Sequence, residues 1–177
     1  GREAVRHTVD VHAKAFAALA LDDAFARVIA VVVQPGVEFG HEDIVVYRPE
    51  AAADLKGFLA EEPRLVFEAH STDYQPDDAL RRLVGDGFSI LKVGPWLTFA
   101  LRETLYGLSH IADILAPAPD GPSLRDAMEA LMLEKPDNWR KYCHGSEAEV
   151  AVQRHFSLSD RIRYYWPDAA AQGAVDR

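Results

Sequence analysis

The most constraining feature of this chain is an order of elements that occurs three times: an apolar strand, a short polar or glycine-containing loop, and a helix. Strands that follow one another through a helix pair in parallel and are joined by right-handed crossovers. Parallel strands covered by helices are buried on both faces and consist mainly of Val, Ile and Leu. We therefore predict an α/β fold with three adjacent parallel strands, each buried on both faces. The expected strands are residues 28–34, 65–69 and 89–93.

The segments after the third unit predict a second region. Residues 117–122 are rich in proline and glycine and form a linker, and Ser123-Leu-Arg-Asp126 resembles a capping box that begins another helix. The helix expected before the linker, residues 95–115, carries regularly spaced leucines on one side. We divide the chain into residues 1–116, which carry the β/α units, and residues 117–177, a helical C-terminal extension.

Three β/α units are few for a complete fold of this class. An open, flavodoxin-like sheet has more strands, and a closed (β/α)8 barrel uses roughly 250 residues, more than the 177 present. We therefore expect the chain to be the last three β/α units of a TIM (β/α)8 barrel plus the extension, and thus part of a longer protein.

Composition excludes several classes of function. The formal charge is −9 and no basic stripe with interleaved aromatics occurs, which argues against nucleic-acid binding. The single cysteine, Cys143, rules out an internal disulfide and fits a cytoplasmic location. No apolar run reaches membrane-spanning length and no signal peptide is recognised, so no membrane partner is expected. The absence of GxxxxGK[ST] and GxGxxG sequences argues against a kinase.

Charged side chains interrupt two of the apolar strands near their carboxyl ends. Glu68 and His70 are two residues apart, so both point to one face of their strand, and Lys92 interrupts the next strand. Charges inside such strands cost free energy unless they are paired or used, and β/α barrels bind ligands at the carboxyl ends of their strands. We predict that Glu68, His70 and Lys92 are catalytic and converge on one pocket. The alternatives are a structural Glu68–His70 hydrogen bond and an internal Lys92–Glu68 ion pair.

Two further sets of residues are candidates for binding. Glu38 and His41 follow the preceding strand, and together with His70 they could ligate a divalent metal such as Zn²⁺ or Mn²⁺. No signature spacing accompanies them, so a site without a metal stays open. Ser71 and Gly94 follow the last two strands, where barrels commonly bind phosphate.

A cluster near the end of the chain is a second candidate for phosphate binding. Arg161 and Arg163 can each grip a phosphate through two parallel hydrogen bonds, and Tyr164 and Tyr165 follow them directly. The alternative is a docked tail that is held by salt bridges and aromatic packing.

Four segments together resemble one family, the GatZ/KbaZ-like subunits of class II tagatose-1,6-bisphosphate aldolase, once labelled tagatose-6-phosphate kinases. The resemblance covers nearly the whole chain and the segments occur in the order and spacing of the family. They are VVVQPGVEFG (31–40), LVFEAHSTDYQ (65–75), DGFSILKVGPWLTFALRE (86–103) and SLSDRIRYYWPD (157–168).

The resemblance implies a fold and two alternative roles. The fold is a barrel of class II aldolase type. The first role is that of a non-catalytic accessory subunit that supports a catalytic Y-type partner in galactitol or amino-sugar catabolism, within an oligomer. The alternative is a metal-dependent epimerase that interconverts fructose 6-phosphate and tagatose 6-phosphate at C4. Catalytic members place zinc-binding histidines on strand ends, and Glu68 lies nearest the last of those positions here.

Overall fold

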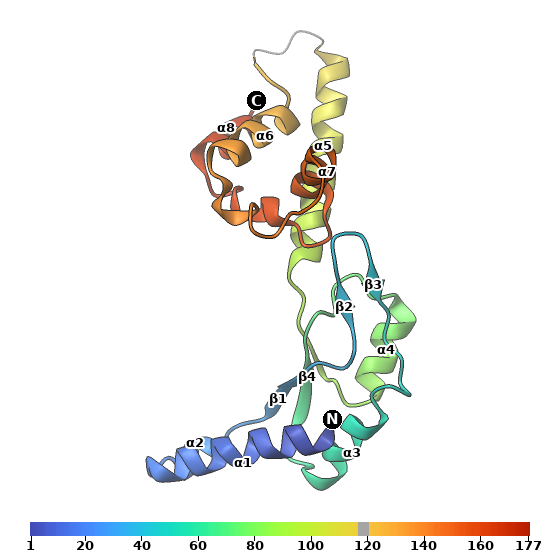
Figure 1. The fold of residues 1–177 in the computed structure, drawn as a ribbon, viewed down its shortest axis with the longest axis vertical. Coiled ribbons are helices and arrows are strands. Elements are labelled where there is room, and N and C mark those ends of the chain that lie inside the picture. Colours follow the sequence, from blue (N-terminus) through green and yellow to red (C-terminus); the bar gives the residue numbers. More distant parts are fainter. Residues whose placement is uncertain (117–120) are drawn as a thin grey trace. The chain divides into compact units, whose positions relative to one another are not determined.

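The computed structural model describes residues 1–116 and 121–177. The predicted linker at residues 117–120 lies outside the described residues. Two compact units form within the chain (Figure 1): unit 1 is Gly1–Phe39 with Ile44–Val93, and unit 2 is Gly40–Asp43 with Gly94–Arg177. The helix that follows Gly94 groups with the C-terminal helices, whereas the division at residue 116 drawn from the sequence placed it with the β/α units.

Unit 1 is built around a parallel sheet. Its elements are α1 (Arg2–Ala18), α2 (Asp22–Phe25), β1 (Ala30–Val33), β2 (Glu38–Phe39), β3 (Ile44–Val45), α3 (Ala53–Glu61), β4 (Val66–Ala69), α4 (Asp77–Gly85) and β5 (Ile90–Leu91). The order β1-β4-β5 is parallel throughout, which confirms the predicted pairing of three successive β/α strands. The segment between β1 and α3, expected to be a loop, contains the antiparallel pair β2 and β3.

One face of this sheet packs against the helices through aromatic rings. The ring of Phe67 on β4 lies 6.1 Å from that of Phe58 on α3 and 5.2 Å from that of Phe88, which begins the third strand region. Ala69, two residues after Phe67, is fully buried on the same face, as alternation along a strand requires. This face forms the core of unit 1.

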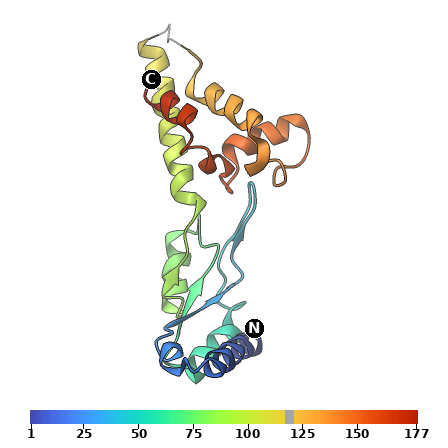
Figure 2. The same ribbon diagram turned by 90° about the vertical axis from the view of Figure 1, so that its left-hand side faces the viewer.

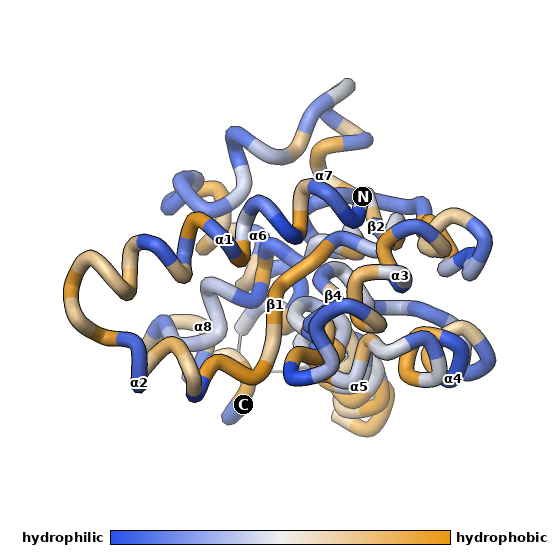
Figure 3. Tube along the Cα trace, turned by 90° about the horizontal axis from the view of Figure 1, so that it is seen from below, coloured by the Kyte–Doolittle hydropathy of each residue, from blue (hydrophilic) through white to orange (hydrophobic). Residues whose placement is uncertain are grey.

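The opposite face of the sheet is open, so the prediction of burial on both faces is wrong. Val32 is 54% exposed, Ile90 is also exposed, and Glu68 is half-buried. In Figure 3, β1 is hydrophobic along its length although part of that surface is exposed. The continuous apolar sequence predicted a second covering layer, and the described residues do not provide one.

Unit 2 is helical. Its elements are α5 (Pro95–Leu115), α6 (Leu124–Glu134), η1 (Pro136–Asn138), α7 (Glu147–Phe156), η2 (Arg161–Tyr164) and α8 (Ala169–Val175). In Figure 2, α6 and α7 lie to one side of the long helix α5, and α8 lies in front of it. Ser123 caps α6 by accepting a hydrogen bond from the amide of Asp126, which confirms the predicted start of that helix. A complete capping box, Ser146 with Glu149, begins α7.

The buried face of α5 differs from a simple leucine stripe. The side chains that unit 2 buries include Arg102 and Tyr106, whereas Leu97, Leu101 and Leu108 are exposed. Arg102 is 1% exposed because its guanidinium stacks over the ring of Phe99, 4.2 Å from the ring centroid, and pairs with the buried carboxylate of Asp160. The interior of unit 2 therefore contains polar side chains of α5, while several of its leucines remain exposed.

These exposed apolar surfaces predict the behaviour of the 177-residue chain alone. Open β-edges and apolar patches drive association when nothing covers them. We expect the isolated chain to self-associate or to unfold without a sharp transition, because Val32, Leu97 and Leu108 remain in water. Light scattering coupled to gel filtration, followed by calorimetry, measures both properties. A compact monomer with a single cooperative transition would contradict this expectation.

Candidate functional site

The open face of the sheet in unit 1 carries the predicted catalytic residues. The register pairs Val32 with Glu68 and Glu68 with Ile90, so these three residues lie in one row across the sheet. His70 follows Glu68 by two residues and Lys92 follows Ile90 by two, which places both on the same face, one step closer to the carboxyl ends of the strands. The amide of Lys92 donates to the carbonyl of Ala69 at 2.9 Å, which extends the pairing of β4 and β5 to this step.

Glu68 and His70 are directly paired. His70 Nε2 lies 3.2 Å from Glu68 Oε1, and the two side chains are 35% and 28% exposed. With Glu68 ionised, this hydrogen bond assigns the hydrogen of the neutral ring to Nε2 and leaves a lone pair on Nδ1. Among the described residues, Nδ1 of His70 has no hydrogen-bond partner. A carboxylate that orients a histidine with one accessible nitrogen is an arrangement suited to general base catalysis.

Lys92 adds a positive charge to this face. Its side chain is exposed and forms no ion pair with Glu68 within residues 1–116 and 121–177, so the alternative of an internal pair is not found. Its backbone is fixed, because its carbonyl accepts a hydrogen bond of 2.9 Å from the hydroxyl of the buried Thr72. The ammonium group is therefore available to an anion or to a developing negative charge.

The loop after β4 is held in a constrained conformation. Ser71 and Tyr74 both have positive φ angles, 57° and 61°, a region that non-glycine residues adopt only when their surroundings enforce it. Ser71 Oγ lies 3.4 Å from Nε2 of Gln34, at the end of β1. Gln75, which is buried, accepts a hydrogen bond from the amide of Tyr47 and so ties the end of the loop into the core. Such fixed loops at strand ends are characteristic of binding sites.

The residues proposed as metal ligands are engaged elsewhere. Glu38 in unit 1 accepts a hydrogen bond of 3.0 Å from Gln34. His41 in unit 2 uses both ring nitrogens, Nδ1 with Ser157 Oγ at 2.6 Å and Nε2 with the carbonyl of Tyr142 at 2.9 Å. Within the part of the chain that the structure describes, no three His, Cys, Asp or Glu side chains gather as metal ligands do. Glu68 and His70 alone could supply two ligands, and a divalent metal stays a prediction.

The predicted phosphate-binding residues are distributed over both units. Ser71 belongs to the constrained loop of unit 1. Gly94 is the N-cap of α5, and Pro95 directly after it has no amide hydrogen to offer an anion. Arg161 and Arg163 lie on η2 in unit 2, and each guanidinium stacks over an aromatic ring.

A buried polar network in unit 2 was not predicted from the sequence. The hydroxyl of Tyr106 on α5 lies 2.7 Å from Nδ1 of His155 on α7, and Nε2 of His155 lies 3.0 Å from Glu129 on α6. Arg154 forms a bidentate ion pair with the same carboxylate. Burial lowers the pKa of His155, and the neutral ring can bridge the other two groups.

This network predicts an acid-sensitive contribution to stability. The groups that face His155 are Tyr106 on α5, Glu129 and Arg125 on α6, and Arg154 on its own helix. Because the pKa of His155 is lower folded than unfolded, the unfolded state binds more protons below about pH 6.5. We expect the free energy of unfolding to fall as the pH decreases from about 7 to 5, measured by urea denaturation, and to fall less in His155→Gln. An equal decrease in both proteins would contradict the assignment.

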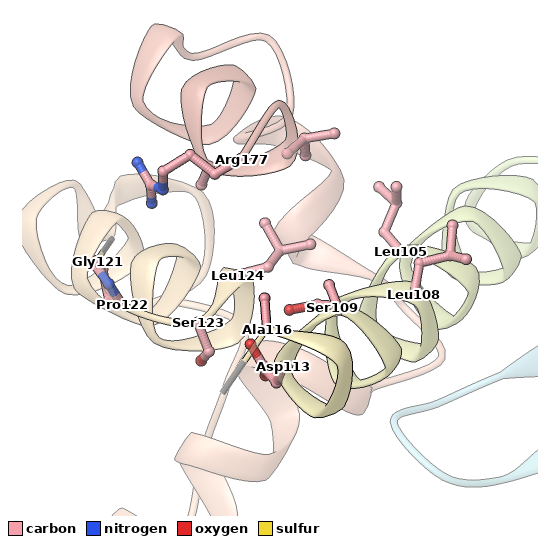
Figure 4. Close-up of a pocket in the computed structure, with 13 residues that line it drawn as sticks. Leu105, Leu108, Ser109, Asp113, Ala116, Gly121, Pro122, Ser123, Leu124 and Arg177 are labelled. Atoms are coloured by element: carbon pink, nitrogen blue, oxygen red, sulfur yellow. The ribbon is translucent and has the colours of Figure 1, made fainter. Parts of the chain in front are cut away.

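One cavity of unit 2 is mainly apolar and contains none of the predicted catalytic or binding residues. It has a volume of about 450 Å³ and lies between the second half of α5, the start of α6 and the end of α8 (Figure 4). Leu105, Leu108 and Leu124 line it, with Asp113 and Arg177 at its margin. It offers no arrangement of acid, base or nucleophile, so the chemistry is better sought on the sheet of unit 1.

The family of the chain follows from its match to a protein-family model. The model of the D-tagatose-1,6-bisphosphate aldolase subunit GatZ/KbaZ-like family matches residues 1–177. The chain belongs to the GatZ/KbaZ-like family. No helix among the described residues of this family member is long and apolar enough to cross a membrane.

Relatives within the family carry two different names. The chain is 54% identical over 173 residues to a D-tagatose 6-phosphate 4-epimerase of Agrobacterium fabrum, covering 98% of this chain and 41% of the relative. It is 47% identical over 170 residues to a D-tagatose-1,6-bisphosphate aldolase subunit GatZ of Salmonella dublin, covering 96% and 40%. The chain thus spans about two fifths of the length of these curated relatives.

A solved structure agrees closely with the fold. The crystal structure of a protein from Sinorhizobium meliloti 1021, described as a probable tagatose 6-phosphate kinase, superposes with a TM-score of 0.97 at 56% sequence identity. The match covers 99% of this chain and 46% of that one. The α/β fold with its parallel sheet is therefore shared with this relative.

Proposed function

We propose that the protein is a tagatose 6-phosphate 4-epimerase whose reaction takes place on the open face of the unit 1 sheet. The observation that carries the proposal is the Glu68–His70 pair, with Nδ1 of His70 accessible and the ammonium group of Lys92 one strand away. The relative named as an epimerase, 54% identical to this chain, supports the same choice of reaction.

The proposal includes the complete fold. We propose that β1, β4 and β5 are the last three strands of a TIM (β/α)8 barrel of class II aldolase type. Glu68, His70 and Lys92 would then point into the barrel at the carboxyl ends of its strands, where such enzymes hold their active sites. The open face of the sheet and its exposed Val32 support this proposal, because a barrel interior would cover that face.

Inversion at C4 can be derived from these residues. His70 takes the proton from the C4 hydroxyl, the C3–C4 bond breaks, and its electron pair moves toward the C2 carbonyl to give an enediolate. Lys92 stabilises the negative charge that develops on the C2 oxygen, and Glu68 stabilises the imidazolium of His70. The aldehyde then presents its opposite face, the C3–C4 bond forms again, and His70 returns the proton. Fructose 6-phosphate and tagatose 6-phosphate are interconverted without net gain or loss of atoms.

The binding roles also stay proposals. Ser71 in unit 1 keeps its proposed role in phosphate binding, as do Gly94, Arg161 and Arg163 in unit 2. We also propose a divalent metal at this Glu68–His70 pair, which would further stabilise the enediolate oxygen; because Nδ1 of His70 acts as the base, the metal would be held by Glu68.

The second candidate is the accessory subunit of D-tagatose-1,6-bisphosphate aldolase. The 47% identity to GatZ subunits favours it, because those relatives are named as subunits of that aldolase. In this case the protein would bind a catalytic Y-type subunit in an oligomer and act through its outer surface rather than through Glu68 and His70.

One assay separates the two candidates. The full-length protein is purified alone and incubated with tagatose 6-phosphate, with and without Mn²⁺ or Zn²⁺, and the sugars are followed by ¹³C NMR. The epimerase proposal expects fructose 6-phosphate to form without any partner. The accessory proposal expects no turnover alone and an increased aldolase rate when a Y-type subunit is mixed with the protein.

A further inference from the structure

Cations and aromatic rings alternate along one surface of unit 2. The guanidinium of Arg161 lies 3.8 Å from the ring centroid of Tyr142 and 4.6 Å from that of Tyr164. Arg163 lies 4.5 Å from the same Tyr164 ring. We refer to Tyr142, Arg161, Tyr164 and Arg163 as the Tyr–Arg stack. Both rings are partly exposed, so the stack is accessible to solvent.

The stack carries more positive than negative charge, and the acid near it among the described residues is the buried Asp160, which interacts with Arg163. Neither Arg161 nor Arg163 forms an ion pair there, and Lys141 places its ammonium 5.2 Å from the outer ring, that of Tyr142. By contrast, Arg125, Arg154 and Lys135 of the same unit all pair with acidic side chains. In a chain of net charge −9, three neighbouring cations beside a single buried carboxyl group form a local site for an anion.

The two arginines of the stack differ in what their nitrogens do. Arg163 donates through Nη1 to the carbonyls of Ser159 and Asp160 and through Nη2 to the hydroxyl of Tyr164, so it braces the backbone and the ring. Arg161 donates only through Nε, to the carbonyl of Asn138 at 2.7 Å. Among the described residues, Nη1 and Nη2 of Arg161 have no hydrogen-bond partner.

We propose that Arg161 is the phosphate-binding residue of unit 2, while Tyr142, Tyr164 and Arg163 are positioning residues that hold its guanidinium plane. The class of ligand, a phosphate monoester, rests on the proposed function. A planar guanidinium fixed between two rings presents two parallel N–H donors, the geometry that a phosphate monoester accepts. Because the rings and the Nε hydrogen bond already restrict Arg161, binding costs less rotamer entropy than with a free arginine.

Phosphate binding by the full-length protein tests this assignment without turnover. Inorganic phosphate is titrated by isothermal calorimetry into the wild type, Arg161→Gln and Arg161→Lys. We expect about a 10- to 100-fold weaker affinity in both variants, because lysine keeps the charge but not the paired donors. Arg125→Gln is the matched control, since Arg125 is paired with Asp126 and its loss leaves the stack intact. Unchanged affinity in both Arg161 variants, with normal melting temperatures, would overturn the proposal.

The role of the rings is tested by a conservative pair of substitutions. Tyr142→Phe keeps the ring and should bind phosphate like the wild type, whereas Tyr142→Leu removes the stacking surface and should bind more weakly. Equal binding by the two variants would contradict a positioning role. This test does not depend on catalysis. If phosphate binding depends on Arg161 but the protein has no epimerase activity, the anion site is supported and only the epimerase proposal is rejected.

Discussion

Replacing His70 by Ala is expected to lower the kcat for interconversion of tagatose 6-phosphate and fructose 6-phosphate by about 10²- to 10⁴-fold, the usual effect of losing a general base. Glu68→Gln should lower kcat strongly as well. The amide can still contact the ring, but it no longer stabilises the imidazolium that forms when His70 accepts a proton. Both side chains are half-buried on an open sheet face, so the fold should survive both changes.

The controls for this experiment lie on the same sheet. Val32→Ala changes a half-exposed residue in the row of Glu68 and should leave kcat within a few-fold of the wild type. Circular dichroism and melting temperature show whether each variant is folded. Unchanged turnover in both Glu68→Gln and His70→Ala would exclude this face of the sheet as the catalytic site and direct attention to Arg161 and Arg163.

Replacing Phe67 by Ala is expected to destabilise the protein by about 3–5 kcal/mol. The Phe67 ring is fully buried between Phe58 and Phe88, so truncation removes two aromatic contacts and leaves a cavity in the core of unit 1. The measurement is the shift in the urea midpoint of the full-length protein. Val84→Ala on α4 serves as the control, because Val84 is half-exposed and its truncation should change stability by no more than about 0.5 kcal/mol. Similar shifts for both variants would show that the ring cluster does not hold the sheet.

The sequence predicted the order and direction of the strands but not their environment. Alternating apolar strands and helices determine parallel pairing locally, and β1-β4-β5 follows that order. Burial depends on residues that lie outside a strand, and so the exposure of Val32 could not be read from its β-branched neighbours. The hairpin of β2 and β3 was also missed, because each of its strands has only two residues.

The candidate site was predicted only in part, because local spacing fixes some of its contacts and long-range packing fixes the others. The i, i+2 spacing fixes Glu68 and His70 on one face, and the structure adds their hydrogen bond. The engagement of His41 with Ser157 joins residues 116 positions apart, and no local pattern indicates it. The network around His155 likewise depends on three helices meeting. The capping box at Ser146 and Glu149 was a local signal that sequence reading could have found.

A crystal structure of the full-length Glu68→Gln variant with tagatose 6-phosphate bound would show whether the reaction takes place on this sheet face. We expect the C4 hydroxyl to lie within hydrogen-bond reach of His70 Nδ1, about 2.6–3.2 Å, with the C2 oxygen facing the ammonium of Lys92. A sugar bound in the apolar cavity beside Leu108 and Leu124, or with its C4 hydroxyl remote from His70, would show that His70 is not the base.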